Sequence, residues 1–248
     1  MKDLYKFWKK EEKTPFSGWD FSHLKNRMIE EKPPWNYNLL AKRLVKKSTA
    51  VLDMGTGGGE IFSSFAPFPA CAVATEGYPP NYIIAKKRLK SLNVKVIKFS
   101  NSLTRKMPFK KEEFDLILNR HDAFNSNELF RILQNNGIFL TQQVGENLWD
   151  LMKEFNVKPM FHRWNAEIAR KQLKDAGFKI EEYRKWKGKV EFKDLGAMVY
   201  FLKVVPWIVK NFSINKYLMV LEKLQNKIDS GKKLVFTEGR FLIKARKV

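Results

Sequence analysis

The segment at residues 51–60, Val-Leu-Asp-Met-Gly-Thr-Gly-Gly-Gly-Glu, limits what this chain can fold into more than any other. An apolar run ends in Asp53, and glycines follow at positions 55, 57 and 59 before a predicted helix. Glycine is needed where a backbone turns tightly and approaches a ligand with no Cβ in between. The segment therefore predicts a strand, a ligand-binding turn at its carboxyl end and a helix, the place where open α/β sheets bind ligands.

Strands and helices alternate through the middle of the chain, which predicts a parallel, doubly wound α/β sheet. The expected strands are 50–53, 70–75, 94–99, 114–118 and 138–142, and the helices among them are 60–65, 79–89 and 128–133. Beyond them we expect a helix at 165–176, a strand at 178–186, helices at 194–205 and 214–228, and a strand through 241–245.

The chain is predicted to form one domain with helical additions. Asp20 can cap a helix running to about Glu31, where Pro33-Pro34 stops it, and a second helix is expected at 36–46. We divide the chain into a helical cap (1–48), a cofactor-binding core (49–189), a helical lid or insert (190–232) and a last strand (233–248).

Two classes of cofactor fit a glycine turn followed by an acidic residue at the end of the second strand. Glu76 lies 21 residues after Gly55, where a carboxylate can accept hydrogen bonds from ribose hydroxyls. A dinucleotide site, however, expects a third glycine at position 60, which is glutamate, and pyrophosphate would lie beside Asp53 and Glu60. A cationic ligand with an ammonium group suits Asp53 better, which favours S-adenosylmethionine.

Asp53-x-Gly55-x-Gly57-x-Gly59 resembles the first motif of the class I S-adenosylmethionine-dependent methyltransferases. The segments 106–109 and 113–119 resemble the family's approach to its fourth strand, and 133–140 resembles the following helix, turn and strand. The resemblance covers about residues 36–248. It implies a seven-stranded, mostly parallel, Rossmann-like sheet with an antiparallel last strand, N-terminal helices and a helical insert before that strand.

The resemblance also implies roles for individual residues. The glycines let the backbone pass close to the cofactor, Asp53 orients its methionine part, and Glu76 binds its ribose. The family's acidic residue for adenine is absent, and Asn101 or Ser102 stands in that segment. The full cofactor-binding set expected is Asp53, Gly55, Thr56, Gly57, Gly59, Glu76, Gly77, Asn101, Ser102 and Asn119.

The segment 119–122, Asn-Arg-His-Asp, is expected just past the fourth strand, where family members often place substrate-facing residues. His121 could remove a proton from an acceptor and Arg120 could hold an anionic group. Alternatively, His121 caps a helix or pairs with Asp122. The segment lacks the Asn/Asp-Pro-Pro-aromatic signature of amino-group methyltransferases of adenine and cytosine. Gln142 and Gln143, after the fifth strand, are further substrate-contact candidates.

Composition leaves the methyl acceptor open. The net charge of +21 comes mainly from lysine, 36 against 11 arginines, which suits a solvated basic surface, although RNA remains a second possible acceptor. We expect a cytoplasmic enzyme with a small-molecule acceptor and no membrane or metal partner. A single cysteine, Cys71, excludes a disulfide framework. The glycine motif would also fit a non-catalytic S-adenosylmethionine-binding protein and, more distantly, a dehydrogenase.

Overall fold

The computed structural model describes residues 2–248. Its strands are β1 (Met28–Glu30), β2 (Ala50–Met54), β3 (Cys71–Glu76), β4 (Lys95–Lys98), β5 (Phe114–Arg120), β6 (Leu133–Val144), β7 (Phe178–Phe192) and β8 (Leu234–Lys247). Its α-helices are α1 (Lys2–Lys13), α2 (Tyr37–Val45), α3 (Glu60–Ser63), α4 (Pro79–Leu89), α5 (Ser126–Ile132), α6 (Trp149–Glu154), α7 (Ala166–Asp175), α8 (Leu195–Val204) and α9 (Leu218–Asp229). Two 3-10 turns, η1 (Ser22–Leu24) and η2 (Lys90–Leu92), complete the elements.

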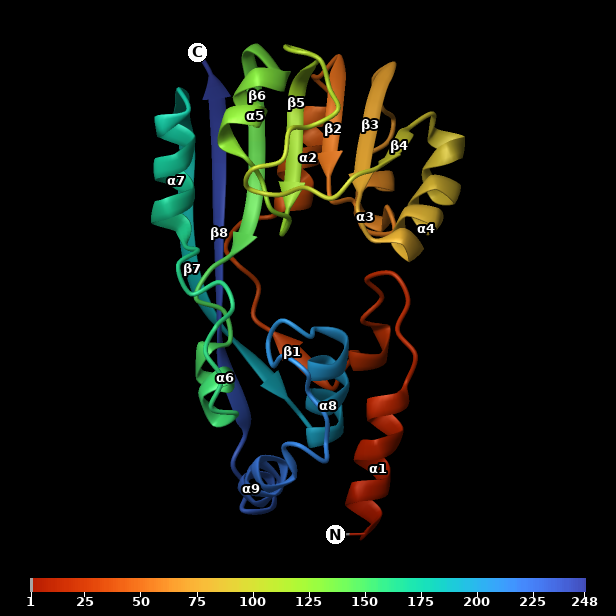
Figure 1. The fold of residues 1–248 in the computed structure, drawn as a ribbon, viewed down its shortest axis with the longest axis vertical. Helices are drawn as coiled ribbons and strands as arrows, with labels where there is room; N and C mark the ends of the chain where they lie inside the picture. The colour runs from red at the N-terminus through yellow and green to blue at the C-terminus, as the bar shows by residue number, and fades with distance from the viewer. Residues whose placement is uncertain (1) are drawn as a thin grey trace.

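The strands form one sheet in the order β1-β7-β8-β6-β5-β2-β3-β4 (Figure 1). The pairs β2–β3, β3–β4, β2–β5 and β5–β6 are parallel. The pairs β6–β8, β7–β8 and β1–β7 are antiparallel. The doubly wound α/β sheet with an antiparallel last strand is thus confirmed.

Apolar residues alternate along the strands, so each face of the sheet has its own core. On one face, α2, α3 and α4 pack over β2, β3 and β5, with Val51, Ala74 and Leu118 in the contact. On the other face, α5 and α7 pack over the same sheet around Ile117 and Phe139. Polar N-caps fix where several of these helices begin, since the side chains of Asn36, Asn125 and Asn165 accept hydrogen bonds from their first turns.

A third core lies beyond the carboxyl ends of the parallel strands. We call this part the distal lobe, formed by residues 2–30, 148–157 and 190–236. In it, α1, α6, α8 and α9 pack around Trp8, Leu151 and Tyr200. Strands β7 and β8 run from the main sheet into the distal lobe, and Figure 1 shows them joining its upper and lower halves. The carboxyl ends of β2, β3 and β5 therefore face the distal lobe.

Two sequence predictions are wrong in detail. The helix expected at 20–31 is absent: Asp20 does accept a hydrogen bond from Ser22 N (2.8 Å), but η1 ends after one turn and Asn26 takes a left-handed φ of 62°. The following residues pair with the edge of β7 as β1, which makes the sheet eight-stranded instead of seven-stranded. Within residues 2–48, α1 packs in the distal lobe and α2 packs on the main sheet.

Within residues 2–248, no helix has the length and apolar character needed to cross a membrane.

Candidate active site at the carboxyl edge of the sheet

The turn after β2 has a backbone that only glycine adopts without strain. Gly55, Gly57 and Gly59 have φ values of 64°, 63° and 80°. Space is equally restricted: a Cβ on Gly55 would collide with the Asp122 carboxylate, and one on Gly57 would lie 2.5 Å from Trp19 Cδ1. Gly59 is the N-cap of α3. We call residues 55–59 the glycine loop; it is the close-approach turn predicted from the sequence.

Glu76 ends β3 beside the glycine loop, as predicted. Its Oε2 accepts a hydrogen bond from Gly57 N (2.8 Å), and its Oε1 accepts one from Tyr78 N (2.7 Å). Each carboxylate oxygen keeps a second lone pair, so the group can also accept from two hydroxyls of a ligand. Burial raises the pKa of Glu76, while the two backbone N–H donors oppose that rise.

Asp53 is buried at the end of β2, with an exposed fraction of 8%. Burial raises its pKa to about 7, the nearby carboxylates of Asp122 and Glu76 act in the same direction, and Arg120 opposes them. A positively charged group bound here would stabilise the ionised carboxylate and lower that pKa again. The site is thus electrostatically suited to a cationic ligand.

The segment after β4 brings Asn101 to this edge. Its Nδ2 donates to Asp122 Oδ2 (2.5 Å) and, at 3.4 Å, to Thr75 Oγ1. Ser102, in contrast, caps its own turn by accepting from Arg105 N (2.9 Å). Of the two residues expected to contact adenine, Asn101 is therefore the one linked to the other site residues. Gly77 packs closely against the backbone that follows β4.

Asn119 lies at the end of β5 and is completely buried. Its Oδ1 accepts hydrogen bonds from Thr141 Oγ1 (2.9 Å) and Gln143 Nε2 (2.5 Å), and its carbonyl accepts one from Tyr37 Oη (3.3 Å). Gln143 Nε2 also donates to Asp122 O (2.9 Å). This network fixes the ends of β5 and β6 and engages the amide nitrogen of Gln143.

Three buried polar atoms at this edge have no hydrogen-bond partner within the described part of the chain: Thr56 Oγ1, Asn101 Oδ1 and Asn119 Nδ2. Buried polar atoms are nearly always paired, so an unpaired group needs a reason. All three belong to the predicted cofactor-binding set. Their free donors and acceptors fit a polar ligand lying across the ends of β2, β4 and β5.

His121 follows β5 in a left-handed conformation, with φ of 64°. Its Nε2 lies 3.1 Å from Gln142 Nε2, while Gln142 Oε1 accepts from the indole N–H of Trp35 (2.8 Å). The amide N–H must therefore donate to the ring, which places the proton of neutral His121 on Nδ1. Burial, Arg240 and Arg120 all lower the pKa of His121 well below its usual range. The expected pairing of His121 with Asp122 is not seen; Asp122 binds Asn101.

Two arginines lie near His121, and they differ in their partners. Arg240 of β8 forms an ion pair with Glu238 and donates to Asn147 Oδ1 (3.2 Å). Burial raises the pKa of Glu238 to about 7, against the attraction of Arg240. Arg120 makes neither a side-chain hydrogen bond nor an ion pair with any of residues 2–248, and burial lowers its pKa. Arg240 and Glu238 were not predicted, because β8 is far away in sequence.

Aromatic side chains of the distal lobe reach the glycine loop. Trp19, which would meet a Cβ on Gly57, stacks on Phe21 (6.1 Å between centroids, 20° between planes) and packs edge-on against Trp207 (5.9 Å). Trp19 remains 45% exposed. Trp164, in contrast, packs against Phe124 on the main sheet.

Cys71 and His23 lie outside the site. Cys71 begins β3, at the opposite end of the strand from Glu76. His23 pairs with Glu11 (2.7 Å) inside the distal lobe. Among the described residues, no group of three His, Cys, Asp or Glu side chains has the geometry of a metal site.

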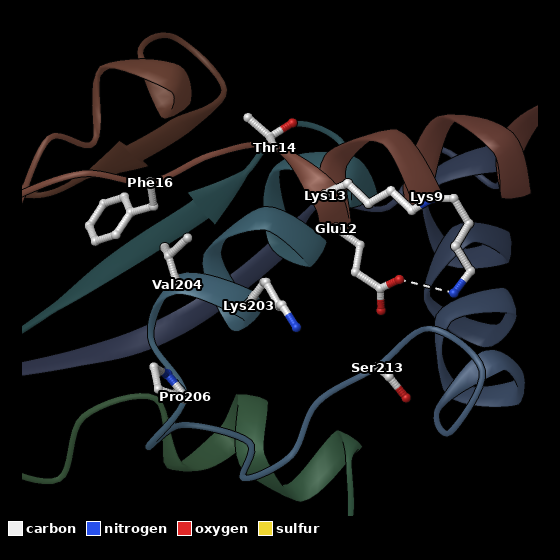
Figure 2. Close-up of a pocket in the computed structure, with 9 residues that line it drawn as sticks. All are labelled: Lys9, Glu12, Lys13, Thr14, Phe16, Lys203, Val204, Pro206 and Ser213. Atoms are coloured by element: carbon white, nitrogen blue, oxygen red, sulfur yellow. Dashed lines mark hydrogen bonds and ion pairs between the residues drawn. The ribbon is translucent and has the colours of Figure 1, made fainter.

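An open groove of about 780 Å³ lies elsewhere, between α1 and the segment after α8. Figure 2 shows Lys9, Glu12 and Lys203 along it, with Glu12 bound to Lys9 (2.9 Å). None of the predicted site residues lines this groove. The chemistry at the carboxyl edge of the sheet is therefore identified by its residues and not by the size of a cavity.

Comparison with known proteins relates the chain to methyltransferases. Residues 52–141 match a family model described as a methyltransferase domain. A methyltransferase candidate from Bacillus halodurans has the same fold, with a TM-score of 0.60 and 21% identity over 85% of this chain and 98% of that one. The YcgJ protein of Bacillus subtilis gives a TM-score of 0.59 and 16% identity, with coverages of 85% and 97%.

Phosphoethanolamine N-methyltransferase 2 of Haemonchus contortus, solved in complex with S-adenosylmethionine, gives a TM-score of 0.53. Its identity is 17%, over 86% of this chain and 52% of that one. No curated protein matches the chain.

Proposed function

We propose that the chain is a class I S-adenosylmethionine-dependent methyltransferase, which binds S-adenosylmethionine at the glycine loop and methylates a small-molecule acceptor held beside His121. The observation that carries this proposal is the convergence of the glycine loop, Glu76 and the hydrogen-bonded His121 at one edge of the sheet. When bound, S-adenosylmethionine supplies an electrophilic methyl group on a sulfonium.

The residues of the edge fit this cofactor. Glu76 has free lone pairs for the ribose hydroxyls, and the buried Asp53 carboxylate suits the ammonium group. Asn101 Oδ1 is an unpaired buried acceptor, which supports our proposal that it accepts from the adenine amino group in the role that an acidic residue has elsewhere in the family. The glycine loop has no room for a Cβ at Gly55 or Gly57, where Asp122 and Trp19 lie against the backbone.

His121 is proposed as the base. An acceptor that is methylated on oxygen or nitrogen must also lose a proton, and His121 would take it. The acceptor's proton passes to Nε2 of His121 once the acceptor's O–H or N–H replaces the Gln142 amide there. A neutral ring at pH 7 can take that proton, and such a base contributes about 10²–10⁴ in rate. Gln142 and Trp35 are positioning residues that hold the ring.

A small acceptor is favoured over RNA because the distal lobe covers this edge. Trp19 of that lobe contacts the glycine loop, so an acceptor must fit between the two parts of the molecule. Water exclusion by such a cover assists transfer. The basic charge is lysine-rich and spread over the chain, as on a solvated surface.

The test uses S-adenosylmethionine labelled on its methyl group, incubated with the protein and a lysate that is then separated into RNA, protein and low-mass fractions. We expect label in the low-mass fraction. Label that is released by RNase would make RNA the acceptor, and binding with no transfer to any fraction would indicate a non-catalytic binding protein.

Two variants separate cofactor binding from transfer. Asp53→Ala should abolish S-adenosylhomocysteine binding, and retained affinity would contradict the assignment of the glycine-loop site. His121→Ala should slow transfer and leave cofactor binding unchanged, with His162→Ala, an exposed histidine, as its control. An unchanged rate in His121→Ala would remove His121 as the base.

A further inference from the structure

Asp122 places its carboxylate against the first residue of the glycine loop. A Cβ built on Gly55 would collide with this group, with Asp122 Cγ at 2.6 Å and Asp122 Cβ at 2.7 Å. The aspartate thus lies in the space that the missing side chain of Gly55 leaves beside the end of β2. Asp122 is not a member of the predicted cofactor-binding set, and the proposed methyl transfer does not use it.

Hydrogen bonds from three segments hold Asp122 in this position. Its Oδ2 accepts from Asn101 Nδ2 (2.5 Å), and its Oδ1 accepts from Ala123 N (2.8 Å). Its carbonyl oxygen accepts from Gln143 Nε2 (2.9 Å) at the end of β6. All three donors are neutral, so they fix the carboxylate without cancelling its charge. The residue is partly exposed, so a ligand bound over the glycine loop can reach it.

Two further carboxylates at this turn are buried and form no ion pair. Asp53 and Glu76 have exposed fractions of 8% and 7%, and neither forms an ion pair with any of residues 2–248. Because water reaches less than a tenth of either side chain, solvent compensates these two charges poorly. Burial raises the pKa of Asp53, Glu76 and Asp122, and the charge of Asp122 raises the pKa of the first two further, although Arg120 lowers that of Asp53. A cation bound among the three carboxylates would relieve this repulsion.

A buried amide next to Gly55 is a second indication of a ligand at this position. Asn119 is completely buried and pairs with Met54, the residue before Gly55, across β5 and β2. Its Oδ1 accepts from Thr141 and Gln143, whereas its Nδ2 has no partner within residues 2–248. Buried donors are nearly always paired, so this one is expected to meet an acceptor on a bound molecule. The amide and the carboxylates together indicate a polar, positively charged ligand beside Gly55.

The proposed cofactor carries one positive charge that its product lacks. S-adenosylmethionine has a sulfonium and S-adenosylhomocysteine a neutral thioether, while the ammonium, carboxylate, ribose and adenine groups are common to both. Under the proposed function, Glu76 binds the ribose and Asp53 the ammonium group. Asp122 is the remaining carboxylate of the three, so it is the one available to the sulfonium.

We propose that Asp122 supplies the counter-charge to the sulfonium and makes the site bind S-adenosylmethionine more tightly than S-adenosylhomocysteine. This inference rests on the proposed function for the identity of the cofactor. An opposite charge within about 4–6 Å favours the charged form of a group by about 1–3 pKa units, which corresponds to about tenfold or more in an equilibrium constant. The neutral product is then held less tightly than new cofactor, which favours their exchange.

Calorimetric titration tests the proposal with S-adenosylmethionine, S-adenosylhomocysteine and sinefungin, which has a carbon bearing an ammonium group in place of the methylated sulfur. We expect wild-type protein to bind the two ligands charged at this position about tenfold or more tightly than S-adenosylhomocysteine. Asp122→Asn should reduce that preference to about twofold or less and leave the Kd for S-adenosylhomocysteine within about threefold, because asparagine still accepts from Asn101 through its Oδ1. Asp175→Asn, at an exposed position at the end of α7, removes the same charge elsewhere and should keep the wild-type preference.

Three results would overturn the inference. The first is wild-type protein that shows no preference for the two charged ligands, a result that needs no variant. The second is a preference that survives unchanged in Asp122→Asn. The third is an equal loss of all three affinities in Asp122→Asn, which would assign Asp122 to a group that the ligands share. If wild-type protein binds none of the three ligands, the proposed function itself fails, whereas equal binding of all three leaves the proposed function standing and removes only this inference.

Discussion

A methyl group added at Gly57 tests whether the glycine loop is built for close approach of a ligand. Gly57→Ala places a Cβ in the left-handed region (φ 63°), which costs about 1–2 kcal/mol, and puts that carbon 2.5 Å from the Trp19 ring. For a chain of this length each kcal/mol lowers Tm by about 2–4 °C. We therefore expect a Tm loss of about 2–8 °C from backbone strain, with displacement of Trp19 in addition.

Gly231→Ala is the matched control, because Gly231 also has a positive φ (80°) but no heavy atom near its missing Cβ. It should lose the same stability through strain and keep its affinity for S-adenosylhomocysteine. Gly57→Ala should bind S-adenosylhomocysteine at least about tenfold more weakly, or about 1.4 kcal/mol. Calorimetry and thermal melting measure both quantities. Equal cofactor affinity in the two variants would refute close approach at Gly57.

Three further predictions concern stability. Asp53 has a pKa of about 7 in the folded protein against 3.8 normally. Between these two pH values the folded state holds a proton that the unfolded chain releases. The free energy of unfolding is therefore higher below about pH 4, and about 4 kcal/mol of it is lost as the pH rises to 7. Asp53→Asn should remove that loss in urea unfolding, and identical pH profiles would argue against it. Trp35→Phe leaves the buried Gln142 Oε1 without its hydrogen-bond donor and should lower the free energy of unfolding by about 1–3 kcal/mol. An unchanged urea midpoint would mean that water replaces the indole N–H. Arg27→Met removes two hydrogen bonds to Asp194 and an ion pair to Glu11, and should lower stability by about 1.5–3 kcal/mol; an unchanged Tm would count against it.

Local patterns predicted the main sheet well, because its signals are contained within short segments. The strand ending in Asp53, the glycines after it and Glu76 at the end of the next strand need no long-range information, and all lie where the pattern placed them. β1 was missed because three residues have no periodicity of their own. Their backbone is paired only because β7 extends beyond the main sheet and offers an open edge.

The site residues that directly follow the parallel strands could be predicted from the sequence. Those contributed by the distal lobe and by β8 could not. Nothing near Arg240 or Trp19 in the sequence points to the glycine loop, since β8 and the N-terminal segment are brought there by tertiary packing. The role of Gln142 was open for a similar reason. Its hydrogen bonds to Trp35 and His121 span 107 and 21 residues.

The two long strands also determine how the protein can admit an acceptor. β7 and β8 have 15 and 14 residues and form a paired ribbon about 45–50 Å long, with one register shift between Ile180 and Glu182, that passes from one half of the molecule to the other. Gly188 and Gly239 lie in adjacent rungs near the middle of this ribbon, where missing side chains make a strand easiest to bend. The acceptor would then enter when the β7–β8 pair bends, while the hydrogen bonds between the two strands stay formed. Because paired strands bend only a little, the opening would stay narrow and would favour compact acceptors over bulky ones.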